Sequence, residues 1–196
     1  SRLFLKIFEK RLRSLALVDS KITPDAMKNI EFALQTPSCH LISLNFQFCF
    51  LDARCMHILS KGLEANRTLI KLDLSNNGLA PISGVYLVKS LSNNITLHEL
   101  NLSKNNLTDD FAIKLAATLR ENDILWKVDI SYNPIESAGA ESLISALKED
   151  NDSLESLGNI EVNTQMGVNN IQELKKHLKI NEVSKDLKKK ITTGIG

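Results

Sequence analysis

The chain has 196 residues, of which 43% are hydrophobic and 24% are charged, and its formal net charge is +1. This length and composition are typical of a globular chain of one or two domains, and no apolar run approaches the roughly 18 residues of a membrane-spanning helix. The near-neutral charge argues against a dedicated nucleic-acid binder, because such domains are usually strongly basic.

The chain opens with apolar residues at a helical spacing. Leu3 and Ile7 stand four positions apart, and this interval places two side chains on one face of a helix. We therefore expect residues 1–11 to form a partial repeat or an N-terminal cap helix ahead of the first strand.

One phrase then recurs along the chain. Its clearest copies read LIKLDLSNNGL, LHELNLSKNNL and LWKVDISYNPI, and two weaker copies precede them. The copies begin at Leu12, Leu41, Leu69, Leu97 and Leu125, so that 29 residues separate the first two starts and 28 separate each later pair. A repeat length between about 20 and 50 residues is typical of a solenoid. Solenoids present broad ordered surfaces, which favours a binding function over a catalytic one.

Each repeat contains a strand pattern followed by a helix pattern. In the fourth copy, Leu100 and Leu102 alternate with polar residues, as in a strand with one buried face. Phe111, Leu115 and Leu119 then follow at helical intervals. A single strand–helix unit cannot bury its apolar stripe alone, so stacked copies must bury it between them. We predict an α/β solenoid of about five full repeats, a curved horseshoe with parallel strands on the concave face and helices on the convex face.

An amide side chain recurs where each strand ends. Asn77, Asn105 and Asn133 stand eight residues after their repeat starts. The turn that leaves a buried strand exposes backbone N–H and C=O groups to the interior, and an amide can satisfy both kinds. Cys49 holds this position in the second repeat and Ser20 in the first. We therefore expect Cys49 to be structural, and the first repeat to be less well specified.

The LxxLxLxxNxL phrase, the helical apolar pairs and the Asn-x-Thr triplets at Asn66 and Asn94 resemble the ribonuclease-inhibitor-like class of leucine-rich repeats. The resemblance covers about residues 3–180 and leaves the subfamily open. That class includes ribonuclease inhibitor, the repeat domains of NOD-like receptors, the Ran GTPase-activating protein and several cytoskeletal and ciliary proteins. The resemblance implies protein–protein interaction, usually through the concave face and the strand-to-helix loops.

The pattern becomes irregular toward the C-terminus. Residues 154–180 fit a degenerate last repeat with a capping helix, because Asn159 replaces a strand leucine and a helical pattern follows Gly167. We therefore predict a leucine-rich-repeat domain over residues 1–180 and a basic tail over residues 181–196, which forms either a short helix or a flexible segment. From Asn169 onward, seven lysines accompany three acidic residues. The tail fits a solvated terminus, a contact for an acidic partner or a link to further sequence, and RNA binding through its lysines is a further alternative.

The sequence contains no strong signature of catalysis or metal binding. Cys39, Cys49, Cys55 and His57 are separated by ten, six and two positions, which does not match the ligand pairs of zinc sites. The odd number of cysteines favours reduced thiols in a cytoplasmic protein, and no glycine-rich phosphate loop occurs. We expect no catalytic residue, cofactor, metal or small-molecule substrate, and we expect protein partners rather than nucleic acid or membrane.

Two alternatives to a simple binding module remain. The first is a permanent structural subunit of a larger cytoskeletal or ciliary assembly, in which the convex side is also buried. The second is a Ran-type GTPase-activating protein, because the resemblance extends to that family. Its members depend on polar residues in strand-to-helix loops and on an arginine, and Arg54 is the arginine in such a loop here.

The concave strand face is the expected binding surface. We expect the strand side chains two, four, six and seven positions after each repeat start to face inward and to form columns across the repeats. Aromatic residues near the face are of the kind that anchors interfaces, although Trp126 could instead pack at the strand edge. The candidate partner-binding residues are Phe48, Lys71, Asp73, Glu99, Asn101, Lys104, Trp126, Lys127, Asp129 and Tyr132. The alternative is that the same face is simply the solvated side of the sheet.

Overall fold

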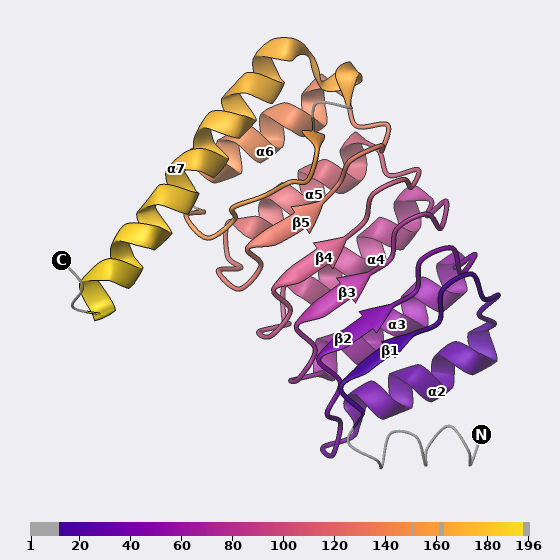
Figure 1. Cartoon of the computed structure of the whole chain (residues 1–196). Helices are drawn as coiled ribbons and strands as arrows, with labels where there is room; N and C mark the ends of the chain where they lie inside the picture. Colours follow the sequence, from indigo (N-terminus) through magenta and orange to yellow (C-terminus); the bar gives the residue numbers. More distant parts are fainter. Residues whose placement is uncertain (1–11, 150, 161–162, 194–196) are drawn as a thin grey trace.

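The computed structural model describes residues 12–149, 151–160 and 163–193, and it consists of stacked strand–helix units (Figure 1). The predicted cap at residues 1–11 lies outside the described residues. The elements in chain order are β1 (Ser14–Ala16), α2 (Pro24–Gln35), β2 (Ser43–Asn45), α3 (Ala53–Ala65), β3 (Lys71–Asp73), α4 (Pro81–Leu91), β4 (Glu99–Asn101), α5 (Asp109–Leu119), β5 (Lys127–Asp129), α6 (Ser137–Glu149), the short 3-10 helix η2 (Thr164–Met166) and α7 (Val168–Thr193).

The strands form one parallel sheet in sequence order, β1-β2-β3-β4-β5. Each strand pairs with the next in the register set by the repeat, so that Leu44, Leu72 and Leu100 stand side by side. A single bridge from Lys127 to Ser156 adds a sixth rung beyond β5. The periodic sequence therefore becomes a periodic ladder, because equal repeat lengths bring equivalent residues to the same height.

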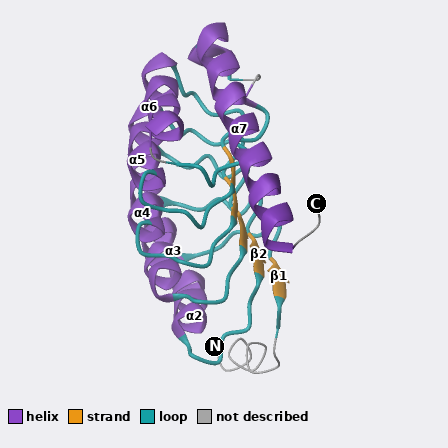
Figure 2. Cartoon of the chain, turned by 90° about the vertical axis from the view of Figure 1, so that its left-hand side faces the viewer, coloured by secondary structure: helices purple, strands orange, loops and turns teal. Residues whose placement is uncertain are grey.

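Helices α2 to α6 form a second layer against one face of the sheet (Figure 2). Each of α2 to α6 starts twelve residues after its repeat start. The Asp52 carboxylate accepts a hydrogen bond of 2.7 Å from the Cys55 backbone N–H, which caps the N-terminus of α3. Leu59 and Leu63, an apolar pair predicted to face the core, are fully buried. Because packed helices lie 8–10 Å apart and strands about 4.8 Å apart, the stack curves with the strands inside. The predicted α/β solenoid is confirmed.

The asparagines at the strand ends act as predicted. Asn105 Oδ1 accepts hydrogen bonds from the backbone N–H groups of Asn77 (3.1 Å) and Leu79 (3.0 Å) in the preceding repeat. Its Nδ2 donates to the carbonyl oxygens of Leu74 (3.1 Å) and Leu102 (2.9 Å). Each such amide therefore connects two turns of the solenoid with donors and acceptors that would otherwise be buried without partners.

Cys49 occupies the same position and is structural. Its thiol is buried and donates to the Leu17 carbonyl at 2.6 Å. Burial raises the pKa of this thiol above its ordinary value, which keeps the proton that the hydrogen bond uses. Cysteine therefore replaces asparagine here as a donor to the preceding repeat.

A second asparagine ladder stands at the helix ends, and the sequence analysis noted two of its members, Asn66 and Asn94, without recognising their structural role. Asn66 Nδ2 donates to Leu34 O at 2.8 Å, and its Oδ1 accepts from Leu69 N at 2.7 Å. The same contacts join later repeats, through the buried side chains of Asn94, Asn122 and Asn151. Each of these residues lies at or just after the end of one helix, and its Oδ1 accepts from the backbone that leads into the next repeat.

The C-terminal boundary differs from the prediction. We expected the repeat domain to end at residue 180, but α7 continues to Thr193 without interruption. It has 26 residues, whereas α2 to α6 have 11 to 13, and its C-terminal half extends past the other helices (Figure 1). Residues 181–193 therefore belong to the capping helix and do not form a separate tail.

An ion pair attaches α7 to α6. The Glu173 carboxylate lies 3.0 Å from Lys148 Nζ on α6 and 3.1 Å from His177 Nε2 on its own helix. The hydrogen bonds from Lys148 and then from His177 lower the pKa of Glu173 from 4.5 to about 2. Glu173 is thus ionised over the physiological pH range and joins the cap to the last regular repeat.

Candidate functional site

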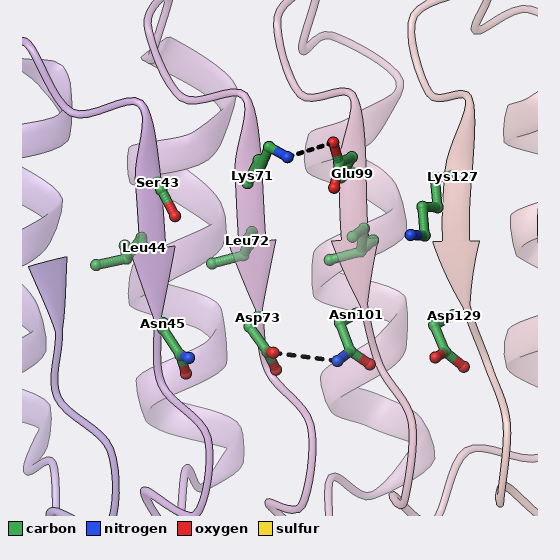
Figure 3. A pocket seen from close by; sticks show the side chains of 11 residues that line it. Ser43, Leu44, Asn45, Lys71, Leu72, Asp73, Glu99, Asn101, Lys127 and Asp129 are labelled. Carbon is green, nitrogen blue, oxygen red and sulfur yellow. Dashed lines mark hydrogen bonds and ion pairs between the residues drawn. The ribbon is translucent and has the colours of Figure 1, made fainter. Parts of the chain in front are cut away.

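The strand face contains a shallow hollow of about 300 Å³ (Figure 3). It lies over β2 to β5, and six of the candidate residues line it. These six are Lys71, Asp73, Glu99, Asn101, Lys127 and Asp129, and the hollow also contacts Ser43, Leu44, Asn45, Leu72 and Leu100. The parallel register therefore gathers into one surface residues that lie up to 86 positions apart, from Ser43 to Asp129.

The side chains of the hollow form two rows across the strands. The row at the strand starts contains Lys71, Glu99 and Lys127, and Lys71 Nζ lies 2.6 Å from Glu99 Oε1. The row at the strand ends contains Asp73 and Asn101, whose Nδ2 donates to Asp73 Oδ2 at 3.1 Å. Two rows arise because the middle residue of each strand points to the core and its two neighbours point away from it.

The row at the strand ends is held by the turns that follow. Asp73 Oδ1 accepts hydrogen bonds from the backbone N–H (2.9 Å) and the hydroxyl (2.6 Å) of Ser75. Asp129 Oδ1 accepts the same two bonds from Ser131, at 2.9 and 2.6 Å. These bonds fix the carboxylates before any partner arrives, and a preorganised surface loses less conformational entropy on binding.

The residues seven positions after the repeat starts form a ridge along the strand-to-helix turns. Phe48, Lys104 and Tyr132 have φ angles of 58°, 56° and 57°. Phe48 is 45% exposed and Tyr132 is 54% exposed, and Lys104 Nζ lies 5.5 Å from the centre of the Tyr132 ring. These three candidates do not line the hollow. They lie beside the hollow at the side where the strands end, because each of them follows the last residue of its strand by three positions.

The sequence analysis did not select Phe50, which the structure makes conspicuous. Its side chain is 70% exposed and its φ angle is 52°. The third repeat has Gly78 at the same position, with a φ angle of 63°. An aromatic residue at a position where another repeat has glycine was the signal that could have identified it.

Trp126 does not line the hollow. It lies just before β5, at the edge of a second hollow of about 300 Å³ that also contacts His98, Asp123 and Lys185. Lys185 Nζ of α7 stands 4.5 Å from the centre of the indole ring and forms an ion pair of 2.6 Å with Glu155. Trp126 therefore packs at the strand edge beneath the capping helix, and we remove it from the concave-face candidates.

The residues considered for chemistry do not form a reactive cluster. Cys39, Cys49 and Cys55 are buried free thiols, and burial is the main reason that the pKa of Cys55 rises to about 11. Within the described ranges, no three His, Cys, Asp or Glu side chains are placed to hold a metal ion together. Arg54 lies in the first turn of α3 and not in the loop that we expected. None of the helices described is both long enough and apolar enough to cross a bilayer.

Sequence comparison agrees with this architecture. Residues 65–88, 93–116 and 125–143 match the family described as Leucine Rich repeat. The human protein "NACHT, LRR and PYD domains-containing protein 14" is 37% identical over 68 residues, which are 35% of this chain and 6% of that protein. The match thus spans a small part of the curated relative.

Two solved structures share the fold. "Leiomodin-1 Actin-Binding Site 2 (ABS2)" superposes with a TM-score of 0.72 at 18% identity, covering 87% of this chain and 93% of that one. The tropomodulin C-terminal domain of Caenorhabditis elegans superposes with a TM-score of 0.66 at 13% identity, covering 86% and 98%. Three segments of the chain thus match leucine-rich repeats, and the solved structures share the fold of the whole described stack; both findings are consistent with the ribonuclease-inhibitor-like class of repeats.

Proposed function

We propose that this chain is a non-catalytic protein-binding module whose partner contacts the concave strand face. The observation that carries the proposal is the hollow over β2 to β5, where two rows of polar side chains of mixed charge are held in place. The strand residues of the hollow include two lysines and three carboxylates. Such a surface suits a protein partner with both signs of charge better than a polyanion.

The size of the face limits the interface. Five strands spaced at about 4.8 Å span roughly 20 Å. This width fits a protein–protein interface near the lower end of the standard size, about 1,200 Å² in total. The exposed aromatic residues Phe48 and Tyr132 on the adjacent ridge add the type of side chain that most often contributes to binding energy.

Cross-linking mass spectrometry after affinity purification from native extract tests the proposal. We expect cross-links from Lys71, Lys104 and Lys127 to a single protein. Charge reversal at both Asp73 and Asp129 should then weaken the affinity for that protein. Unchanged affinity in the double variant, with an unchanged thermal unfolding midpoint, would refute a concave-face interface.

A cytoskeletal subunit is a second candidate, and exposed apolar residues on the helical side favour it. Phe32 on α2, Ile82 on α4 and Ile113 on α5 are 59%, 47% and 43% exposed. The similar leiomodin structure is described as an actin-binding site, so actin is the first partner to test. Co-sedimentation with actin filaments should fall to the level without filaments when Phe32 and Ile113 are both replaced by serine. The three buried free thiols agree with the reducing cytoplasm that such a role requires.

The GTPase-activating alternative has less support. Arg54 is exposed on the first turn of α3, on the helical layer and away from the hollow. An arginine that acts in catalysis must reach the transferred phosphate. A turnover assay with Ran and its GTP, comparing the chain with Arg54→Ala, tests this directly, and we expect neither protein to accelerate hydrolysis.

A further inference from the structure

Some charged side chains of the hollow are paired with a neighbouring strand, and others are not. On β3 and β4, the Lys71–Glu99 ion pair and the Asn101–Asp73 hydrogen bond join side chains of neighbouring strands. On β5, the Lys127 ammonium makes no ion pair, hydrogen bond or ring contact with any residue that the structure describes. Figure 3 shows the two satisfied pairs as dashed lines, and neither reaches β5.

Asp129 has an open carboxylate oxygen for a local reason. Its Oδ1 accepts both hydrogen bonds from Ser131, and its Oδ2 accepts none from the described residues. The residue beside Asp129 on the next rung of the sheet is Gly158. The corresponding neighbour of Asp73 is Asn101, whose side-chain amide donates a hydrogen bond to Asp73. A Cβ atom at Gly158 would overlap the Asp129 carboxylate, and the φ angle of Gly158 is +76°. Gly158 on the sixth rung therefore has no side chain that could donate a hydrogen bond to Asp129.

The two open charges have a fixed spacing. Lys127 and Asp129 are two residues apart on one face of β5, so their Cα atoms lie about 7 Å apart. The exposed ring of Tyr132 follows three residues later, on the ridge beside them. A cation and a carboxylate thus line the β5 end of the hollow, and an exposed aromatic ring follows Asp129 on the ridge that flanks it.

We propose that this end of the concave face, formed by Lys127, Asp129 and Tyr132, is where the partner is anchored. The inference rests on the proposed binding function and specifies the chemistry of the partner. The partner is a protein segment that presents a carboxylate to Lys127 and an ammonium or guanidinium group to Asp129. The β3–β4 end contributes shape only, because its charges are already paired within the chain.

The test compares charge variants at both ends of the hollow. The titrant is the protein identified through cross-links from Lys71, Lys104 and Lys127, and the readout is Kd by isothermal titration calorimetry. We expect Lys127→Glu and Asp129→Lys each to weaken binding about tenfold or more, because each places like charges together at the interface. The matched control, Lys71→Gln with Glu99→Gln, removes the paired charges of β3–β4 without placing a new charge beside Lys127 and should change Kd by about twofold or less. Replacing the partner's acidic residue that contacts Lys127 with lysine should restore the binding of that partner to the Lys127→Glu variant.

Two outcomes distinguish a failure of this inference from a failure of the proposed binding function. Bulky variants inside the hollow, Asn101→Trp on β4 and Ser43→Arg on β2, serve as the reference, with thermal unfolding as the check on folding. If either blocks binding while Lys127→Glu and Asp129→Lys bind normally, the concave interface stands and the anchor at β5 is wrong. If the bulky variants also bind normally, or no protein cross-links to this face, the proposed function is wrong and this inference fails with it.

Discussion

Asparagine has two different structural roles at the residue scale. At the strand ends its amide satisfies backbone groups of two consecutive turns, as Asn105 does. At the helix ends, as in Asn66, it ends the helix and bonds to the helix before it. Both positions are buried, so neither role can be replaced by water.

The strand-end role predicts a large loss of stability in Asn105→Ala. The substitution leaves the N–H groups of Asn77 and Leu79 without an acceptor in the interior. We expect the free energy of unfolding, measured by urea denaturation, to fall by about 3 kcal/mol. Asn106→Ala is the matched control, because Asn106 is the exposed neighbour, and a change below about 0.5 kcal/mol is expected there. Equal effects at the two positions would contradict the assigned role.

Phe50 illustrates the opposite situation, a residue that lowers stability. Its backbone adopts a left-handed conformation with a φ angle of 52° while its ring remains 70% exposed. Phe50→Gly should therefore raise the free energy of unfolding by about 0.5–1 kcal/mol, since glycine adopts this conformation without a Cβ clash. The reciprocal change Gly78→Phe should lower it. A loss of stability in Phe50→Gly would mean that the ring makes contacts that its exposure does not indicate.

At the element scale, the capping helix differs most from the repeats that precede it. Asn181 is buried and donates to Asn151 O and Leu154 O, as a member of the helix-end ladder should. The helix nevertheless continues, because the sequence that follows contains no strand start. In the regular repeats a leucine stands three residues after the asparagine, as in Asn66 and Leu69, whereas Ser184 stands there in α7. The missing leucine is a sequence signal that no further strand begins here, and it argues against a boundary at residue 180.

The attachment of α7 predicts a pH-dependent difference in stability. The pKa of Glu173 is lowered to about 2 from 4.5, so its ionised form stabilises the native state above about pH 4.5 and this contribution disappears as the pH falls toward 2. The wild-type chain should be more stable than Glu173→Gln at pH 6, and the two should converge by pH 2. Glu149→Gln is the control, because the Glu149 carboxylate that pairs with Arg120 is largely exposed to solvent. Thermal unfolding at a series of pH values measures both, and a gap that persists at pH 2 would contradict this assignment.

At the scale of the whole molecule, the C-terminal cap closes the stack of repeats. Ser156 pairs with β5, and α7 packs against α6 and reaches Trp126 through Lys185. An uncapped solenoid exposes apolar surface and a strand edge, which favours association between copies.

Deletion of residues 151–196 should therefore convert the chain into higher-order species. Size-exclusion chromatography with light scattering would detect them. A shorter deletion, of residues 187–196, keeps Lys185 and should elute like the full chain. Identical elution of the full chain and of the variant without residues 151–196 would show that the last repeat is not a cap.

The sequence by itself determined the repeat, the type of fold and which strand residues line the hollow. Equal repeat lengths place equivalent residues on equivalent rungs, so Lys71, Asp73, Glu99, Asn101, Lys127 and Asp129 had to share one face of the sheet. The tertiary structure decided which charges are paired and which remain open, because pairing depends on what the next rung offers, as Gly158 shows for Asp129. It also decided the place of Trp126, which lies beneath Lys185, 59 residues further along the chain. Periodicity fixes the relation between neighbouring repeats, whereas contacts made by the irregular cap follow no period and exist only in the folded chain.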